Sequence, residues 1–192
     1  MQSSYPTHED ILKAKIMDAT IICMMNKGID KTRIGDVAQQ MGVSRQTIYN
    51  YFANKNLLFD AVFSREAVTL AASIAGHIAT VDSLEEKFTQ AFLYAIEAFP
   101  QNPVLRHIIT SGGRFLQETG HSRERMQAFG ELVLHQVFED NPQLREDSAE
   151  ICELLSRNII SFLVMPDPNP RSSEELADFV RRRLLPGLGI GN

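Results

Sequence analysis

The sequence has few of the features that mark secreted or metal-binding proteins. Only two cysteines occur, Cys23 and Cys152, and they lie far apart in the chain. A disulfide framework or a cysteine-based zinc site is therefore not expected. The histidines also lack a short ligand spacing such as His-x-x-x-His, so we predict neither a metal nor a cofactor.

Long hydrophobic runs are missing as well. The longest stretch without Asp, Glu, Lys or Arg, residues 67–81, is too short for a membrane-spanning helix. The first residues include Glu9 and Asp10, whereas a secretory signal would need a basic start followed by an apolar run. We therefore expect a protein of the reducing cytoplasm that has no membrane partner.

Catalytic patterns are absent too. We find no nucleophile–base pair, no Gly-rich phosphate loop and no paired carboxylates at catalytic spacing. The sequence therefore predicts a protein that is not an enzyme and has no catalytic residues, although a small all-helical enzyme stays open as an alternative class.

The charge of the chain is unevenly distributed. The formal net charge is −5, yet residues 1–55 hold seven basic and five acidic side chains, a balance of +2, which leaves −7 for the remainder. The basic residues of this first segment are Lys13, Lys15, Lys27, Lys31, Arg33, Arg45 and Lys55. Because attraction to phosphate is local and is screened beyond about 8–10 Å, the acidic remainder does not exclude binding to nucleic acid.

The hydrophobic pattern favours helices almost everywhere. No run alternates apolar and polar residues, and no hairpin dipeptide such as Asn-Gly separates β-branched segments. We predict an all-α protein of about nine helices, with Thr7 capping the first. Helices near the C-terminus are expected over 122–139, 148–165 and 172–185.

Residues 28–58 carry the most informative pattern. We expect Thr32 to cap a short amphipathic helix that ends at Gly42, a residue able to adopt the positive φ of a tight turn. The apolar positions of that helix are Ile34, Val37, Ala38 and Met41. Ser44 then caps a second short helix. Two short helices joined in this way form a helix-turn-helix, whose second helix enters the major groove of DNA.

The second helix opens with side chains suited to reading base edges. Arg45 can donate two hydrogen bonds to guanine O6 and N7, and Gln46 can pair with adenine N6 and N7. Thr47 can contact a phosphate or a thymine methyl group. Donors to phosphate follow at Tyr49, Tyr51 and Lys55, and the last of these stands where the free N–H groups of the next helix also favour an anion.

A family resemblance becomes specific at these residues. The segment is similar, without gaps, to the N-terminal domain of TetR-family (TetR/AcrR) transcriptional regulators. The matching residues are Ile16 to Ala19, Gly28, Asp30, Thr32, Val37, Ala38, Gly42, Val43, Ser44, Thr47, Tyr49, Tyr51, Phe52, Lys55 and Leu58. Two positions depart from the family pattern: Met41 replaces a small alanine, and Gln46 replaces a small residue of the recognition helix.

Chemistry and resemblance together define the predicted DNA-binding residues. They are Thr32, Arg33, Ser44, Arg45, Gln46, Thr47, Tyr49, Asn50, Tyr51 and Lys55. The resemblance also implies that Ala38, Val43, Ile48 and Phe52 hold the core of a three-helix N-terminal domain, which we place at residues 1–54.

Residues 55–192 would then form a helical domain that binds an effector and dimerises. Its predicted pocket residues are Phe92, Phe99, His107, Phe115 and Phe129, although aromatic residues at helical spacing are more often plain core. The resemblance implies a homodimer through 148–165 and 172–185. The apolar stripes are Ile151, Leu155, Ile159 and Phe162 on the first segment and Leu176, Phe179, Val180 and Leu184 on the second. Alternatively, both stripes face the chain's own core.

The expected function follows from the resemblance. We expect a DNA-binding transcriptional regulator, a repressor that a small-molecule effector of unknown identity releases from a palindromic double-stranded DNA operator. The alternative is a helix-turn-helix-derived adaptor or co-activator that acts through protein–protein contacts.

Overall fold

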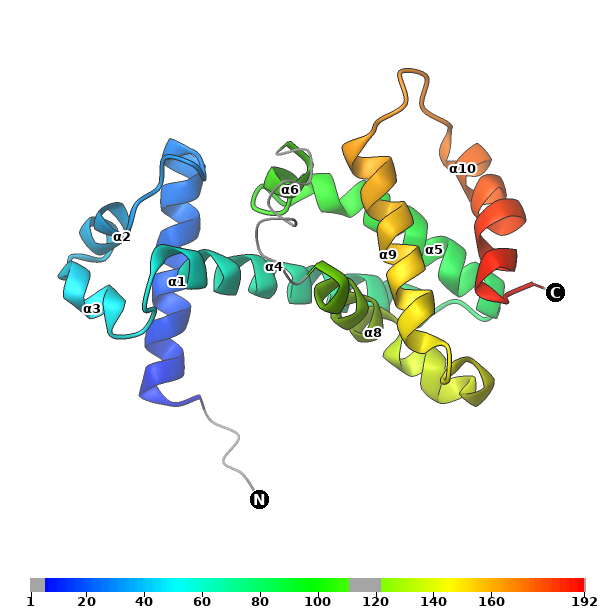
Figure 1. Cartoon of the computed structure of the whole chain (residues 1–192), viewed down its shortest axis with the longest axis horizontal. Coiled ribbons are helices and arrows are strands. Elements are labelled where there is room, and N and C mark those ends of the chain that lie inside the picture. The colour runs from blue at the N-terminus through cyan, green and yellow to red at the C-terminus, as the bar shows by residue number, and fades with distance from the viewer. Residues whose placement is uncertain (1–5, 111–121, 192) are drawn as a thin grey trace. The chain divides into compact units, whose positions relative to one another are not determined.

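A computed structural model describes residues 6–110 and 122–191. Those residues form nine α-helices and no strand, which confirms the all-α prediction (Figure 1). The α-helices are α1 (His8–Lys27), α2 (Ile34–Met41), α3 (Arg45–Tyr49), α4 (Lys55–Ile78), α5 (Leu84–Ala98), α6 (Arg106–Thr110), α8 (Ser122–Asp140), α9 (Ser148–Val164) and α10 (Ser173–Phe179). Short helical turns are η1 (Phe99–Gln101), η2 (Pro142–Leu144), η3 (Val180–Leu184), which continues α10, and η4 (Leu185–Leu188).

The chain divides into two compact units. Unit 1 is Met1–Glu66 and unit 2 is Ala67–Asn192, so the division falls inside α4. The division predicted from the sequence, after residue 54, lies at the first residue of this same helix. Each unit has its own buried residues and is described separately below.

Unit 1 begins with a capped helix. The backbone N–H of Asp10 donates to the hydroxyl of Thr7 at 3.1 Å, and the N–H of Thr7 donates to the Asp10 carboxylate at 3.0 Å. This reciprocal pair satisfies two amides that a helix start leaves without partners and confirms the predicted cap at Thr7. Gly28 ends α1 with a φ of 85°.

The core of unit 1 joins α1, α2 and α3 to the start of α4. Its fully or almost fully buried side chains are Ile16, Met24, Val37, Ala38, Ile48, Phe52, Leu58 and Val62. Gly42 closes α2 in the left-handed region, with φ 67° and ψ 31°, as the sequence predicts. This turn sets α3 against α2 and so fixes which side of α3 is buried.

Unit 2 contains a tightly packed pair of helices, α8 and α9, connected through η2 (Figure 1). A Cβ built on Gly130 would lie 2.5 Å from Cβ of Cys152, so the two helices meet where glycine leaves room. On the outside, Glu153 accepts from Arg123 at 2.6 Å and from Arg157 at 2.8 Å. Both arginines lower the pKa of this carboxyl.

A second part of unit 2 brings α5, α9 and α10 together. The Phe92 ring meets Phe162 edge-on at 5.5 Å, and Phe162 lies 5.8 Å from Phe179. Arg181 of η3 donates to Glu86 of α5 at 2.8 Å. This aromatic row with its flanking ion pair attaches the C-terminal helix to the rest of the unit.

Most residues of the apolar stripes predicted for dimerisation are buried by this packing. Ile151 and Leu155 are each only 4% exposed, and Val180 is fully buried, within one copy of the chain. Most of the stripe residues therefore face the chain's own core, which is the alternative named above. A homodimer through 148–165 and 172–185 stays a prediction. Within unit 2, α5 packs against both α9 and α10.

A search of the helices in the described ranges finds none with the length and apolar content needed to cross a membrane.

Candidate nucleic-acid interface

Helix α3 is a single short element held by its cap. The Thr47 backbone N–H donates to the Ser44 hydroxyl at 3.1 Å, and the hydroxyls of the two residues lie 2.9 Å apart. This confirms that Ser44 caps the second helix of the motif. A helix of five residues is not stable by itself, so the cap and the packing of its buried side determine its conformation.

The buried side of α3 consists of one apolar side chain. Ile48 is fully buried against the rest of unit 1. The exposed residues of the helix and its C-cap are Arg45, Gln46, Tyr49 and Asn50. Thus the side that carries hydrogen-bonding groups lies open to a partner, as reading of base edges requires.

Gln46, which departs from the family pattern, already has a partner. Its amide nitrogen donates to the side-chain oxygen of Asn50 at 3.1 Å, one turn along α3. The pair leaves the Gln46 carbonyl oxygen and the Asn50 amide N–H groups for other partners. The two residues therefore present a joined donor–acceptor surface on the exposed side of α3.

The structure places Thr32 apart from the other predicted contacts. It is fully buried, and its hydroxyl donates to the Gly28 carbonyl at 2.8 Å. The N-cap position of α2 is Arg33, so the prediction that Thr32 caps this helix is wrong. The Thr32 hydroxyl therefore stabilises the turn between α1 and α2 from within the core. Arg33, the next residue, is exposed and accessible to a partner such as DNA.

The start of α2 is fixed by a carboxylate. Asp36 accepts from the Arg33 backbone N–H at 2.8 Å and from the Lys27 ammonium at 2.6 Å. These two bonds, the lysine bond first, lower the pKa of the Asp36 carboxyl. The pair links the end of α1 to the first turn of α2 and so orients α2, the helix that precedes α3.

The residues after α3 form the other edge of the interface. The Asn54 side chain caps α4 by accepting from the Leu57 N–H at 2.9 Å. Lys55 begins that helix, and its ammonium lies 4.7 Å from the centre of the Phe59 ring. Tyr51 is half-buried. This cation–π contact holds the positive charge of Lys55 beside the first turn of α4.

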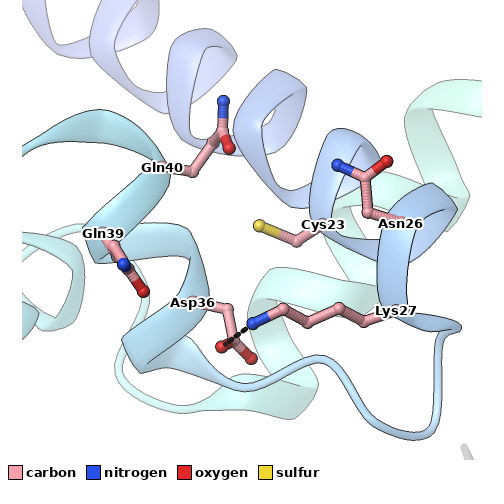
Figure 2. A pocket seen from close by; sticks show the side chains of 6 residues that line it. All are labelled: Cys23, Asn26, Lys27, Asp36, Gln39 and Gln40. Atoms are coloured by element: carbon pink, nitrogen blue, oxygen red, sulfur yellow. Dashed lines mark hydrogen bonds and ion pairs between the residues drawn. The ribbon is translucent and has the colours of Figure 1, made fainter.

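A hollow of about 400 Å³ in unit 1 was not foreseen from the sequence. Figure 2 shows that its lining side chains come from the end of α1 and from α2: Cys23, Asn26, Lys27, Asp36, Gln39 and Gln40. Burial raises the pKa of the Cys23 thiol, so this sulfur is protonated and inert near neutral pH. None of the predicted DNA contacts or effector-pocket residues lines the hollow.

The predicted effector-pocket residues do not share one environment. Phe92 is fully buried and packs against Phe162 as a core side chain. Phe99, His107 and Phe129 are half-buried on η1, α6 and α8. Phe115 lies outside the described residues. Phe92 therefore belongs to the aromatic row of the core, whereas part of the surface of Phe99, His107 and Phe129 is accessible to solvent.

Comparisons with known proteins agree with this geometry. Residues 16–62 match the family described as "Bacterial regulatory proteins, tetR family". The chain is 40% identical over 48 residues to the uncharacterized HTH-type transcriptional regulator YvdT of Bacillus subtilis (strain 168), and 34% identical over 62 residues to the HTH-type transcriptional repressor SCO4008 of Streptomyces coelicolor. The matched stretches span 25% and 32% of the relatives' lengths.

Solved structures extend the likeness to the whole fold. The fatty acid degradation regulator FadR from Bacillus halodurans is similar with a TM-score of 0.63 and 14% identity, covering 94% of this chain and 98% of that one. The TetR family repressor AlkX from Dietzia is similar with a TM-score of 0.62 and 20% identity, covering 92% and 95%. The family resemblance predicted from the sequence is confirmed, in sequence over residues 16–62 and in fold over most of the chain.

Proposed function

We propose that this chain, TetR-like in its N-terminal segment and in its fold, is a sequence-specific DNA-binding transcriptional regulator of the cytoplasm that acts as a repressor. The observation that carries this proposal is the division of α3 into two sides. Ile48 alone is fully buried, and the side chains of Arg45, Gln46, Tyr49 and Asn50 are exposed. A short helix of this kind docks in the major groove, where each base pair shows a distinct set of donors and acceptors.

The positions around α3 support backbone contacts. Arg33 precedes α2, Ser44 and Thr47 stand at the start of α3, and Tyr51 and Lys55 follow it. Contacts of this type fix the register of a protein on the duplex and make its binding sensitive to salt. We therefore assign Arg45, Gln46 and Asn50 to base reading and the flanking residues to the phosphates.

A second copy of the chain completes the operator complex. Helix-turn-helix regulators read two half-sites about one helical turn apart, which requires two recognition helices related by twofold symmetry. Because most of the apolar stripe residues of 148–165 and 172–185 are buried within one copy, we assign pairing to the exposed side of α9, within 148–165, together with the exposed side of α8. Leu132 there is 50% exposed and Leu154 is 40% exposed. We place the dimer interface on these two helices.

Release of DNA by a small molecule is the regulatory part of the proposal. Unit 2 would bind the effector near the half-buried Phe99, His107 and Phe129. Only a difference in affinity between two conformers of the dimer can shift their populations, and going from 1:99 to 99:1 requires about 5.5 kcal/mol. The effector must therefore bind better to a conformer whose recognition helices no longer match successive major grooves.

A titration of the purified protein against the DNA that flanks its own gene tests DNA binding. Arg45→Ala should relax base preference and cost about 1–3 kcal/mol at one operator position, since one bidentate contact is lost. Lys55→Ala should weaken binding to all sequences alike and reduce the slope of log K against log salt by about one unit. Mobility shifts at several salt concentrations measure both effects.

Arg183→Ala is the matched control, because it removes the same charge from an exposed position of unit 2. It should leave base preference unchanged. Wild-type affinity in both the Arg45 and Lys55 variants would contradict the proposed docking. A wild-type protein with no salt-sensitive association with any duplex would favour the adaptor function instead.

The dimer is tested by Leu154→Glu, which places a charge on the outside of α9. Sedimentation should show a shift from dimer to monomer, because burying an unpaired carboxylate costs several kcal/mol. Val68→Glu, at a position 50% exposed on α4, serves as the matched control and should keep the wild-type mass. A Leu154→Glu protein that remains dimeric would exclude this part of the surface.

A further inference from the structure

Gly35 lies directly beneath the side chain of Arg45. It is the second residue of α2, and Arg45 is the first residue of α3. A Cβ built on Gly35 would lie 2.8 Å from Nη2, 3.0 Å from Nε and 3.1 Å from Cζ of Arg45. The guanidinium therefore lies against the backbone of α2, in the space that the side chain of any other residue would occupy.

The backbone of α2 does not require glycine at this position. Among the described residues, glycines with positive φ are Gly28, Gly42, Gly189 and Gly191, and Gly35 is not one of them. Inside a helix glycine is less stable than alanine by about 0.5–1 kcal/mol. Since glycine costs helix stability here and supplies no special conformation, what it contributes is room for the guanidinium.

The Arg45 guanidinium is held by packing alone. In the part of the chain that the structure describes, it makes no hydrogen bond or ion pair, and the side chain is exposed. The nearest acid in sequence to Gly35 is Asp36, whose carboxylate already accepts from Lys27 and from the Arg33 N–H. The N–H donors of Arg45 therefore face solvent and are open to a partner, while the approach to Gly35 restricts the position of the guanidinium.

We infer that Gly35 is a positioning residue for base recognition: by leaving space on α2, it orients the Arg45 guanidinium toward one base pair of the operator. The inference rests on the proposed function. It adds a determinant of base specificity on α2, although α3 is the helix proposed to enter the major groove. Alanine at this position would displace the guanidinium, because the contact would be 2.8 to 3.1 Å. The displaced group is the far end of a flexible side chain, so the fold would not be affected.

The inference predicts a loss of selectivity without a loss of stability. A good bidentate contact discriminates between bases by about 5- to 150-fold, and that discrimination depends on geometry. Gly35→Ala should therefore lower the preference at the base pair read by Arg45 by about fivefold or more. Affinity for unrelated DNA should stay within about twofold, since the charge of Arg45 is retained.

The experiment is a binding-site selection from random duplexes, with the full chain as wild type, Gly35→Ala, Arg45→Ala and the double variant. If Gly35 acts through Arg45, both single variants lose preference at the same operator position, and the double variant loses no more than Arg45→Ala alone. Gly76→Ala is the matched control, because this helical glycine of α4 has open space where its Cβ would be. It should select the wild-type sequence.

Three results would overturn the inference. Gly35→Ala could select the wild-type sequence with wild-type preference, its loss could fall at a different position from that of Arg45→Ala, or the two losses could add in the double variant. A wild-type protein that selects no sequence would overturn the proposed function and the reading role with it. A selective wild type with an unchanged Gly35→Ala variant would overturn only the role of Gly35.

Discussion

Helices in the two units divide their surfaces in opposite ways. In unit 1, α3 buries a single side chain, Ile48, and leaves its polar residues exposed. In unit 2, α9 and the segment of α10 and η3 bury most residues of their apolar stripes and leave few exposed apolar residues, such as Leu154. The difference teaches that a short polar helix with a single buried side chain indicates a binding surface. A long apolar stripe shows only that something covers it, and the sequence does not identify the partner.

Length explains part of this contrast. A five-residue helix makes too few internal hydrogen bonds to be stable alone and depends on the Ser44 cap and on Ile48. Its remaining side chains contribute little to stability and are available for recognition. A helix of seventeen residues such as α9 instead contributes most of one face to the core, and that face is taken by the helices nearest to it.

The largest expected effect concerns Phe92, where the core and pocket interpretations of unit 2 diverge. Phe92→Ala should lower the free energy of unfolding by about 3–5 kcal/mol, because a fully buried aromatic side chain is replaced by a cavity. Denaturant unfolding followed by circular dichroism measures the change. The half-buried Phe99→Ala is the control and should lose less. An unchanged midpoint for Phe92→Ala would revive its role as a pocket residue.

The next effect concerns the contact between α8 and α9. Gly130→Ala should lower the free energy of unfolding, since the steric cost of about 1–3 kcal/mol against Cys152 exceeds the gain in helix propensity of about 1 kcal/mol. Gly76→Ala, with open space around its Cβ, should instead raise stability by up to about 1 kcal/mol. Thermal unfolding of both variants measures the difference in sign. Equal shifts would mean that Gly130 is not a contact point.

The smallest effect concerns the Cys152 thiol, 1% exposed at the same contact. Burial raises its pKa from 9.0 to about 12, so the folded state retains a proton that the unfolded chain releases near 9. The stability linked to this thiol is present below pH 9 and is lost as the pH rises from 9 toward 12. Between pH 8 and pH 10.5 the wild type should therefore lose more stability than Cys152→Ala in denaturant titrations.

A thiol reagent at pH 8 provides an independent check of the same burial. Neither Cys23 nor Cys152 should react in the native protein, and both should react after unfolding. Rapid reaction of Cys152 in the native protein would show that the α8–α9 contact opens readily.

Much of the interface could be predicted from the sequence because its signals are local. Capping by Ser44, the turn at Gly42 and the polar side chains of α3 each depend on residues only a few positions apart. Thr32 was misjudged because its hydroxyl has a backbone acceptor in the preceding turn, at Gly28, which composition does not reveal. The approach of Arg45 to Gly35 could not be predicted either, since it joins two helices across that turn.

The amino-acid sequence by itself determined the all-helical fold, the cap at Ser44, the turn at Gly42 and the chemical character of α3, because these follow from short-range hydrogen bonding and periodicity. Only the tertiary structure decided which apolar faces pack within one chain, as at Phe92, Phe162 and Phe179. An apolar stripe is equally satisfied by any apolar partner, so the choice of that partner depends on where the chain folds back on itself.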